Sequence, residues 1–208
     1  MTTFYLIRHG ETDWNKARKL QGHTDIPLNA TGEQQAKKLT DVLHNVNFDL
    51  AFSSDMIRAK RTAEIILLEK KLHIETTKKL RERTFGELEG QSSEIMTAYF
   101  ALVKALTKEE RKKHRMGKNV ESDEEVTTRL ITFLRETAIT HPEKTILVTT
   151  HSGLLRMLLL HTGEYSYEAL DKFIMENGAY ITFRCDGIDF FIDEVVGMTK
   201  RDSAPKKS

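Results

Sequence analysis

The sequence predicts a single three-layer α/β domain, in which helices cover both faces of a mainly parallel sheet. The first observation is that short β-favouring runs alternate with helical patterns along most of the chain. The second is a closing hairpin signal, in which Asp186-Gly187 separates two apolar segments and adds an antiparallel edge. The third is that 208 residues suffice for one domain with a substantial core, and no linker or internal repeat divides them.

The first half of the chain contains the first three expected strands. Residues 4–7 are an apolar run that predicts a buried strand at the very start. Thr31 and Gln34 have the spacing of a capping box, and apolar residues at helical intervals predict a helix from there to Val46. The other expected elements of this half are a strand, a helix and a short strand, over residues 49–53, 55–69 and 74–77.

The second half begins with an expected helical excursion over residues 92–121, a small lid insertion that is apolar at first and basic over 108–115. Ser122 and Glu125 form another capping box before an amphipathic helix. The remaining expected elements are a central strand, a helix and two hairpin strands, over residues 145–149, 154–160, 179–185 and 188–195.

The expected domain boundaries follow from the last apolar run. We expect the domain to occupy residues 1–198 and the polar, lysine-rich tail 199–208 to be disordered. The exposed edge of the closing hairpin offers a surface on which a homodimer could form.

Composition limits the class of function. Lysine and arginine number 32 against 31 acidic residues, and a net charge of +1 argues against a general nucleic-acid binder. Cys185 is the single cysteine, so neither an intrachain disulfide nor a multi-cysteine metal site is possible. The chain shows no signal-peptide pattern and no apolar segment near the ~20 residues that span a bilayer. We therefore expect a cytoplasmic protein that binds no membrane.

Candidate catalytic residues follow the expected strands. Arg8 and His9 end the first strand, His151 ends the strand near the C-terminus, and the strand over 49–53 leads into a helix that carries Arg58. Ligands of open α/β sheets bind beyond the carboxyl ends of the strands, where these four side chains converge if the strands are parallel neighbours. Two histidines and two arginines make a poor metal site and a good phosphate site.

The expected chemistry is phosphoryl transfer to an imidazole. A neutral imidazole can attack phosphorus, and nearby guanidinium groups favour its neutral form. The same groups stabilise the oxygens of the transferring phosphoryl group. A leaving oxygen also needs a proton, and Glu82 is the carboxylate expected to supply it. Glu87 and Glu89 lie in the same loop and remain alternatives.

The sequence resembles the histidine phosphatase superfamily, which includes cofactor-dependent phosphoglycerate mutases and their phosphatase relatives. The resemblance covers nearly the whole chain and implies a phosphoglycerate mutase-like fold. Five blocks carry it, in the family's order: Arg8-His9-Gly10-Glu11-Thr12, Leu20-Gln21-Gly22, Ser53-Ser54-Asp55 with Arg58, Glu82 with Gly86, and Thr150-His151-Ser152-Gly153.

Carried over position by position, the resemblance implies roles for individual residues. His9 would accept the phosphoryl group and Glu82 would give and take the proton. Arg8, Arg58 and His151 would hold the phosphoryl group. The positions expected to complete the phosphate or substrate pocket are Asn15, Gln21, Gly22 and Ser152. The implied hydrolysis uses no metal and no organic cofactor.

The insertion over 92–121 resembles that of the broad-specificity phosphatase branch, because the mutases carry a longer insertion with a tyrosine and paired arginines that bind the substrate carboxylate. We therefore expect a hydrolase of small phosphomonoesters. A phosphoglycerate mutase is the alternative, followed by a narrower phosphatase for a riboside phosphate, phosphoserine or a sugar phosphate, and by a non-catalytic phosphoester-binding module. The basic run 108–115 is interpreted as a solvated helical face, with a lid that selects anionic substrates as the alternative.

Overall fold

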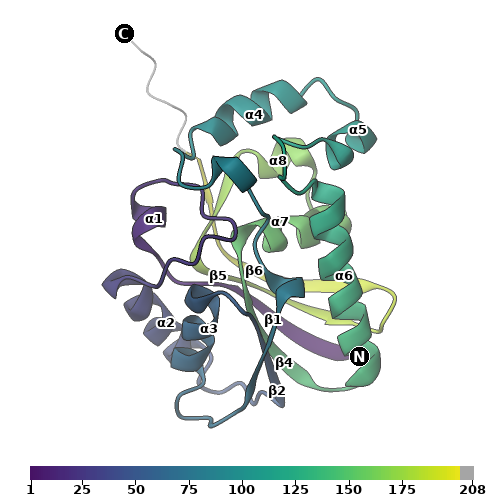
Figure 1. Ribbon diagram of the computed structural model, residues 1–208. Helices are drawn as coiled ribbons and strands as arrows, with labels where there is room; N and C mark the ends of the chain where they lie inside the picture. Colours follow the sequence, from purple (N-terminus) through teal and green to yellow (C-terminus); the bar gives the residue numbers. More distant parts are fainter. Residues whose placement is uncertain (202–208) are drawn as a thin grey trace.

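Six strands form one mixed sheet in the computed structural model, which describes residues 1–201 (Figure 1). The strand order is β3-β2-β4-β1-β5-β6. Strands β1 to β4 are parallel, whereas β5 and β6 run antiparallel at one edge, which confirms the predicted sheet. The strands are β1 (Thr2–Arg8), β2 (Leu50–Ser54), β3 (Ile74–Thr77), β4 (Thr145–Thr150), β5 (Phe173–Cys185) and β6 (Phe190–Lys200).

Helices cover both faces of this sheet, as expected for a three-layer domain. Along β4, Ile146 and Val148 pack into one core with α6 and α7, while Leu147 packs on the opposite face with α2 and α3. Figure 1 shows α2 and α3 on one side of the sheet and α6 on the other. The covering helices are α2 (Ala30–Val42), α3 (Ile57–Ile66), α6 (Asp123–Thr140) and α7 (Ser152–His161).

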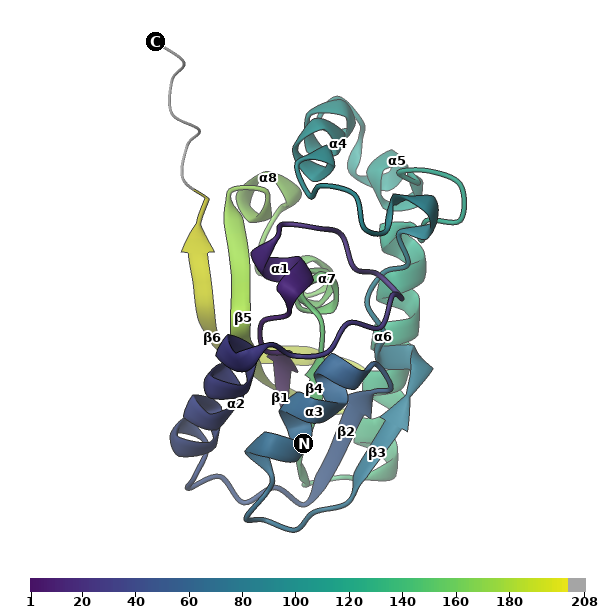
Figure 2. The ribbon, with the colours of Figure 1, turned by 60° about the vertical axis from the view of Figure 1, so that its left-hand side comes forward.

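The shorter elements gather beyond the carboxyl ends of β1 and β4 (Figure 2). Helices α4 (Ile95–Val103) and α5 (Lys108–Lys113) belong to the predicted insertion, and α8 (Tyr167–Leu170) lies beside them. The sequence patterns did not predict α8 or α1 (Asp13–Lys16), each of which has four residues. Two 3₁₀ turns, Lys78–Leu80 and Gly86–Leu88, flank the loop that carries Glu82.

The insertion is fastened to the domain by its basic segment. Arg111 is buried and donates hydrogen bonds to both carboxylate oxygens of Asp171, at 2.9 and 3.0 Å. Its guanidinium carbon lies 4.0 Å from the centroid of the Tyr167 ring. Lys112 pairs with its helix neighbour Glu109 at 2.9 Å. In this part of the basic run, one charge is therefore packed against the domain and another is paired at the surface.

Two boundaries differ from the sequence-based prediction. Helix α2 is capped by Asn29, whose side chain accepts a hydrogen bond from the Gly32 amide at 2.9 Å, so the predicted capping box of Thr31 and Gln34 is wrong. Both Asn and Thr are good N-cap residues, so the residue type alone does not say which of the two caps the helix. The capping box of Ser122, in contrast, is confirmed at the start of α6.

The closing hairpin is longer than predicted at both ends. β5 begins at Phe173, and a register shift between Met175 and Tyr180 conceals its regular alternation. β6 continues to Lys200, so the expected disordered tail begins too early, and residues 202–208 lie outside the described residues. Within residues 1–201, no helix combines the length and apolar character that crossing a membrane requires.

Candidate active site

The strand register brings the predicted residues to one edge of the sheet. β1 and β4 are adjacent and parallel, with Arg8 beside Thr150, so the residues that follow them, His9 and His151, emerge side by side. The two imidazole ring centroids are 5.1 Å apart. The neighbouring strand β2 ends at Ser54, next to β4 on the other side. The sheet therefore brings the carboxyl ends of β1, β4 and β2 together, as predicted.

His9 is held in one tautomer by the backbone. Its side chain is 3% exposed, and Nδ1 lies 2.6 Å from the carbonyl oxygen of Gly10. A carbonyl oxygen only accepts, so Nδ1 carries the proton and Nε2 presents a lone pair. Burial lowers the pKa of His9 well below its usual value, and the charges of Arg58 and Arg8 lower it further. The ring is therefore neutral, with its lone pair at Nε2.

Arg58 is fully buried in the first turn of α3. Its Nη1 donates to the carbonyl oxygen of Thr24 at 3.0 Å and its Nη2 to that of Gly22 at 2.8 Å. Arg8 donates from Nη1 to the carbonyl oxygen of Met175 on β5. Burial lowers the pKa of each guanidinium to about 10, with Glu82 as the strongest opposing charge in both cases. Both groups therefore remain cationic at neutral pH.

His151 is fully buried and contacts the end of β2. Its Nε2 lies 2.9 Å from the hydroxyl oxygen of Ser54. Burial lowers the pKa of His151 well below its usual value, and Arg58 and His9 act in the same direction. Like His9, this imidazole is uncharged.

Glu82 is placed at the start of α7 by backbone and side-chain donors. Its Oε1 accepts from the Arg83 amide at 2.8 Å, and its Oε2 accepts from the Gly153 amide at 3.1 Å and the Ser152 hydroxyl at 3.4 Å. The predicted Ser152 therefore contacts Glu82. Among the charged side chains, Glu82 does most to raise the pKa of both Arg8 and Arg58 against the effect of burial.

The two alternative carboxylates have other surroundings. Glu89 accepts from the amides of His23, Thr24 and Phe85 at 2.9, 2.8 and 3.1 Å. It thereby joins the loop before residue 25 to the loop after Glu82. Glu87 is exposed. Of these three carboxylates, Glu82 is the one that accepts a hydrogen bond from the start of α7, directly after His151.

Gly22 and Gln21 lie in the loop held by Arg58 and Glu89. Gly22 has φ +53°, and a Cβ there would lie 2.1 Å from the Glu89 carboxylate, so only glycine fits. The Gln21 side chain is 7% exposed, and its Oε1 is buried without a partner among the described residues. Gly22 therefore shapes the loop, while Gln21 leaves a polar atom available to a ligand.

Asn15 is engaged with a residue that sequence reasoning missed. Its Oδ1 accepts from the Thr12 amide at 3.2 Å at the start of α1 and from the Asn177 Nδ2 at 3.1 Å. Asn177 also donates to the carbonyl oxygen of His9 at 3.1 Å. The Asn177-Gly178 pair carries a turn signal, which conceals this role within the irregular part of β5.

Five buried side-chain polar atoms have no hydrogen-bond partner within residues 1–201, and four of them belong to predicted site residues. They are Arg8 Nε, Arg58 Nε, His151 Nδ1 and Gln21 Oε1, with Thr149 Oγ1 as the fifth. Buried polar groups are normally paired, so two guanidinium Nε–H donors and a ring nitrogen left without partners at this edge of the sheet are polar atoms that an anionic ligand could satisfy. No group of three or more His, Cys, Asp or Glu in this range has a metal-binding arrangement.

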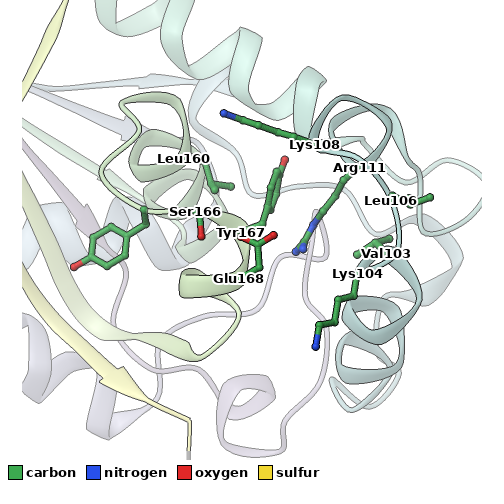
Figure 3. A pocket seen from close by; sticks show the side chains of 10 residues that line it. Val103, Lys104, Leu106, Lys108, Arg111, Leu160, Ser166, Tyr167 and Glu168 are labelled. Atoms are coloured by element: carbon green, nitrogen blue, oxygen red, sulfur yellow. The ribbon is translucent and has the colours of Figure 1, made fainter.

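A small cavity of about 110 Å³ lies elsewhere, between the insertion and α8 (Figure 3). Its walls include Val103, Arg111, Leu160 and Tyr167. Leu160 is eight residues from Ser152 along α7, a separation of roughly 12 Å in a helix. The cavity therefore belongs to the packing of the insertion and is separate from the histidine pair.

The mixed sheet, with two buried histidines, the buried Arg58 and the half-buried Arg8 at its carboxyl edge, defines a phosphoglycerate mutase-like α/β protein. Residues 4–196 match the family model described as histidine phosphatase superfamily, branch 1. The chain belongs to this superfamily.

Similar proteins include both phosphatases and mutase-like proteins. The chain is 38% identical over 159 residues to the uncharacterized phosphatase PhoE of Bacillus subtilis, covering 76% of each. It is 36% identical over 160 residues to phosphoglycerate mutase-like protein 4 of Arabidopsis thaliana, covering 74% of this chain and 67% of that protein.

Solved structures agree with this placement. Bacillus stearothermophilus YhfR superposes with a TM-score of 0.80 and 28% identity, covering 95% of this chain and 97% of that one. Phosphoserine phosphatase from Entamoeba histolytica, in complex with 3-phosphoglyceric acid, superposes with a TM-score of 0.79 and 26% identity. The superposition covers 94% of this chain and 96% of that one. The superfamily and these names indicate an enzyme of phosphoryl transfer.

The two buried neutral histidines predict that stability decreases in acid. The pKa of both is lowered in the folded chain, so below pH 6.5 the unfolded chain takes up protons that the folded chain does not. The free energy of unfolding should fall by at most about 1.4 kcal/mol per pH unit for each histidine. Urea unfolding at several pH values should show a smaller fall for the double variant His9→Gln/His151→Gln. The double variant His44→Gln/His73→Gln changes two exposed histidines and should keep the full pH dependence. If this control lost the pH dependence, the two buried histidines would not be its cause.

A second prediction concerns Gly153, which lies against the Glu82 carboxylate. A Cβ at this position would lie 2.2 Å from Glu82 Oε1, so Gly153→Ala should displace the carboxylate. We expect hydrolysis of p-nitrophenyl phosphate to slow by about 10- to 100-fold. The melting temperature should fall little, because alanine favours a helix over glycine by about 1 kcal/mol. Gly117→Ala, where the nearest atom is 3.6 Å away, is the matched control. Full activity of Gly153→Ala would show that Glu82 can move without consequence.

Proposed function

We propose that this protein is a metal-independent phosphatase that hydrolyses small phosphomonoesters through a phosphohistidine intermediate on His9. The observation that carries the proposal is a set of buried nitrogens that have no hydrogen-bond partner within the described chain, Arg8 Nε, Arg58 Nε and His151 Nδ1, at the same edge of the sheet as His9, whose Nε2 is left with a lone pair. Tetrahedral phosphoryl groups present several oxygens that accept such bonds. A nucleophilic nitrogen among oxyanion donors suits attack on phosphorus.

The charges of the site suit a dianionic substrate. Arg8 and Arg58 contribute two positive charges, whereas both histidines are neutral. The two guanidiniums match the two negative charges of a phosphomonoester.

The first step forms the phosphohistidine. The Nε2 lone pair of His9 forms a bond to phosphorus as the bond from phosphorus to the ester oxygen breaks. Glu82 transfers its proton to the leaving oxygen, so an alcohol departs. Arg8, Arg58 and His151 stabilise the oxygens of the transferring group.

The second step releases phosphate. The Glu82 carboxylate takes a proton from a water molecule as that water attacks phosphorus. The bond from phosphorus to Nε2 breaks, and its electron pair returns to the imidazole, which leaves His9 neutral. Inorganic phosphate departs, and Glu82 is protonated again for the next cycle.

Hydrolysis is favoured over mutase activity by the insertion. A mutase of this family needs basic side chains aimed at a substrate carboxylate, whereas Arg111 is committed to Asp171 and Arg115 lies 2.6 Å from Glu125. Two similar proteins are named phosphatases, one of them for phosphoserine. Phosphoglycerate mutase remains the second candidate, because another relative is named mutase-like.

The central prediction concerns His9→Ala. The EDTA-treated protein should release phosphate from p-nitrophenyl phosphate and 3-phosphoglycerate, and the variant should lose at least about 10³-fold of this activity. His73→Ala removes an exposed histidine and serves as the control. Activity that disappears with EDTA would contradict metal independence. Isomerisation of 3-phosphoglycerate, stimulated by 2,3-bisphosphoglycerate with little phosphate release, would show a mutase.

A second prediction tests the acid role of Glu82. General acid catalysis matters most for a poor leaving group, so Glu82→Gln should slow hydrolysis of β-glycerophosphate at least about tenfold more than release of p-nitrophenol in the first turnover. Rapid mixing separates this first turnover from the later hydrolysis of phosphohistidine, which also needs Glu82. Glu87→Gln changes an exposed carboxylate in the same loop and should match the wild type. An equal loss with both substrates would assign the acid role elsewhere.

A further inference from the structure

Ser54 is the one side chain within residues 1–201 that has a polar partner atom within hydrogen-bond distance of Nε2 of His151. Its hydroxyl oxygen lies 2.9 Å from that nitrogen, and both side chains are fully buried. Ser54 ends β2, which pairs with β4 through Ser53 and Thr149, so the sheet fixes the contact. The other ring nitrogen, Nδ1, is buried and has no partner in the described chain.

The direction of this hydrogen bond follows from the other contact of Ser54. Its hydroxyl oxygen accepts from the Met56 amide at 3.3 Å, and an amide can only donate. Among the described residues, the acceptor within reach of the hydroxyl proton is then Nε2 of His151. The opposite arrangement, with a proton on Nε2, would leave the serine proton buried without an acceptor, which is unfavourable.

We infer that Ser54 is a positioning residue that fixes His151 as the Nδ1–H tautomer, so that a neutral imidazole donates a hydrogen bond to the bound phosphoryl group. His9 and His151 then share one tautomer and have opposite functions. In His9 the proton on Nδ1 faces the Gly10 carbonyl oxygen, which leaves a lone pair at Nε2. In His151 the lone pair at Nε2 faces Ser54, which leaves an N–H at Nδ1.

The charges around His151 explain why its tautomer matters. Arg58 from α3, Arg8 and His9 from the end of β1, and Arg129 from α6 all oppose a positive charge on this ring, and burial does so more strongly. An imidazolium would donate from both nitrogens whatever Ser54 did. A neutral ring donates from one nitrogen only, so its partner decides which one. The role in catalysis rests on the proposed function, whereas the tautomer itself does not.

The direct test is nitrogen-15 NMR of histidine-labelled protein at neutral pH, with the His151 signals identified by their absence in His151→Gln. The wild-type protein should show a protonated Nδ1 and a bare Nε2 at His151. Ser54→Ala should shift this ring toward the Nε2–H form, whereas Ser54→Thr, which keeps a hydroxyl, should retain the wild-type signals. An Nε2–H ring in the wild-type protein would overturn the inference without any variant.

The matched control is Ser53→Ala. Ser53 is equally buried on the same strand, and its hydroxyl donates to the carbonyl oxygen of Ser54 at 2.7 Å without contacting His151. Calorimetric titration with inorganic phosphate should show about tenfold weaker binding for Ser54→Ala and unchanged binding for Ser53→Ala. Equal weakening in both variants would reduce Ser54 to a packing role. Because neither measurement needs turnover, failure of the hydrolase proposal would appear separately, in the His9→Ala assay.

Discussion

The buried guanidinium of Arg58 is the interaction on which the site depends. A charge inside a protein needs acceptors, and this one takes the carbonyl oxygens of Gly22 and Thr24, which fastens the polar loop against α3. Its charge also lowers the pKa of both His9 and His151. One side chain therefore shapes the loop, keeps two imidazoles neutral and places positive charge where phosphoryl oxygens would lie.

This arrangement links stability to ligand binding. Arg8 and Arg58 each keep an unpartnered Nε within the described chain, although buried donors are normally satisfied. Phosphoryl oxygens can accept these bonds, and a ligand that binds only the folded chain also stabilises it. In the proposed function, these nitrogens belong to a preorganised anion site and find their acceptors when a phosphoryl group is bound.

The sequence was sufficient for most of the fold and for the central histidine pair. Apolar runs end in Arg8-His9 and in His151, and parallel pairing brings such ends together, so convergence followed from local patterns. Asn177 could not be found in this way, because its contact with the His9 carbonyl oxygen depends on an irregular part of β5. The prediction of the α2 N-cap was wrong for a related reason. Asn29 and Thr31 can both cap a helix, and tertiary packing decides where the first turn begins.

The two histidines show where local sequence stops being informative. Each follows a buried parallel strand, and apart from the family resemblance the residue types around them do not say which ring is the nucleophile and which the hydrogen-bond donor. The distinction lies in which ring nitrogen meets a partner: the Gly10 carbonyl oxygen is one residue from His9, whereas Ser54 comes from another strand, 97 residues away in sequence from His151. The β2–β4 register is therefore part of the chemistry as well as of the fold. A shift of one residue would turn the Ser54 side chain to the opposite face of the sheet and remove the partner that assigns His151 its role.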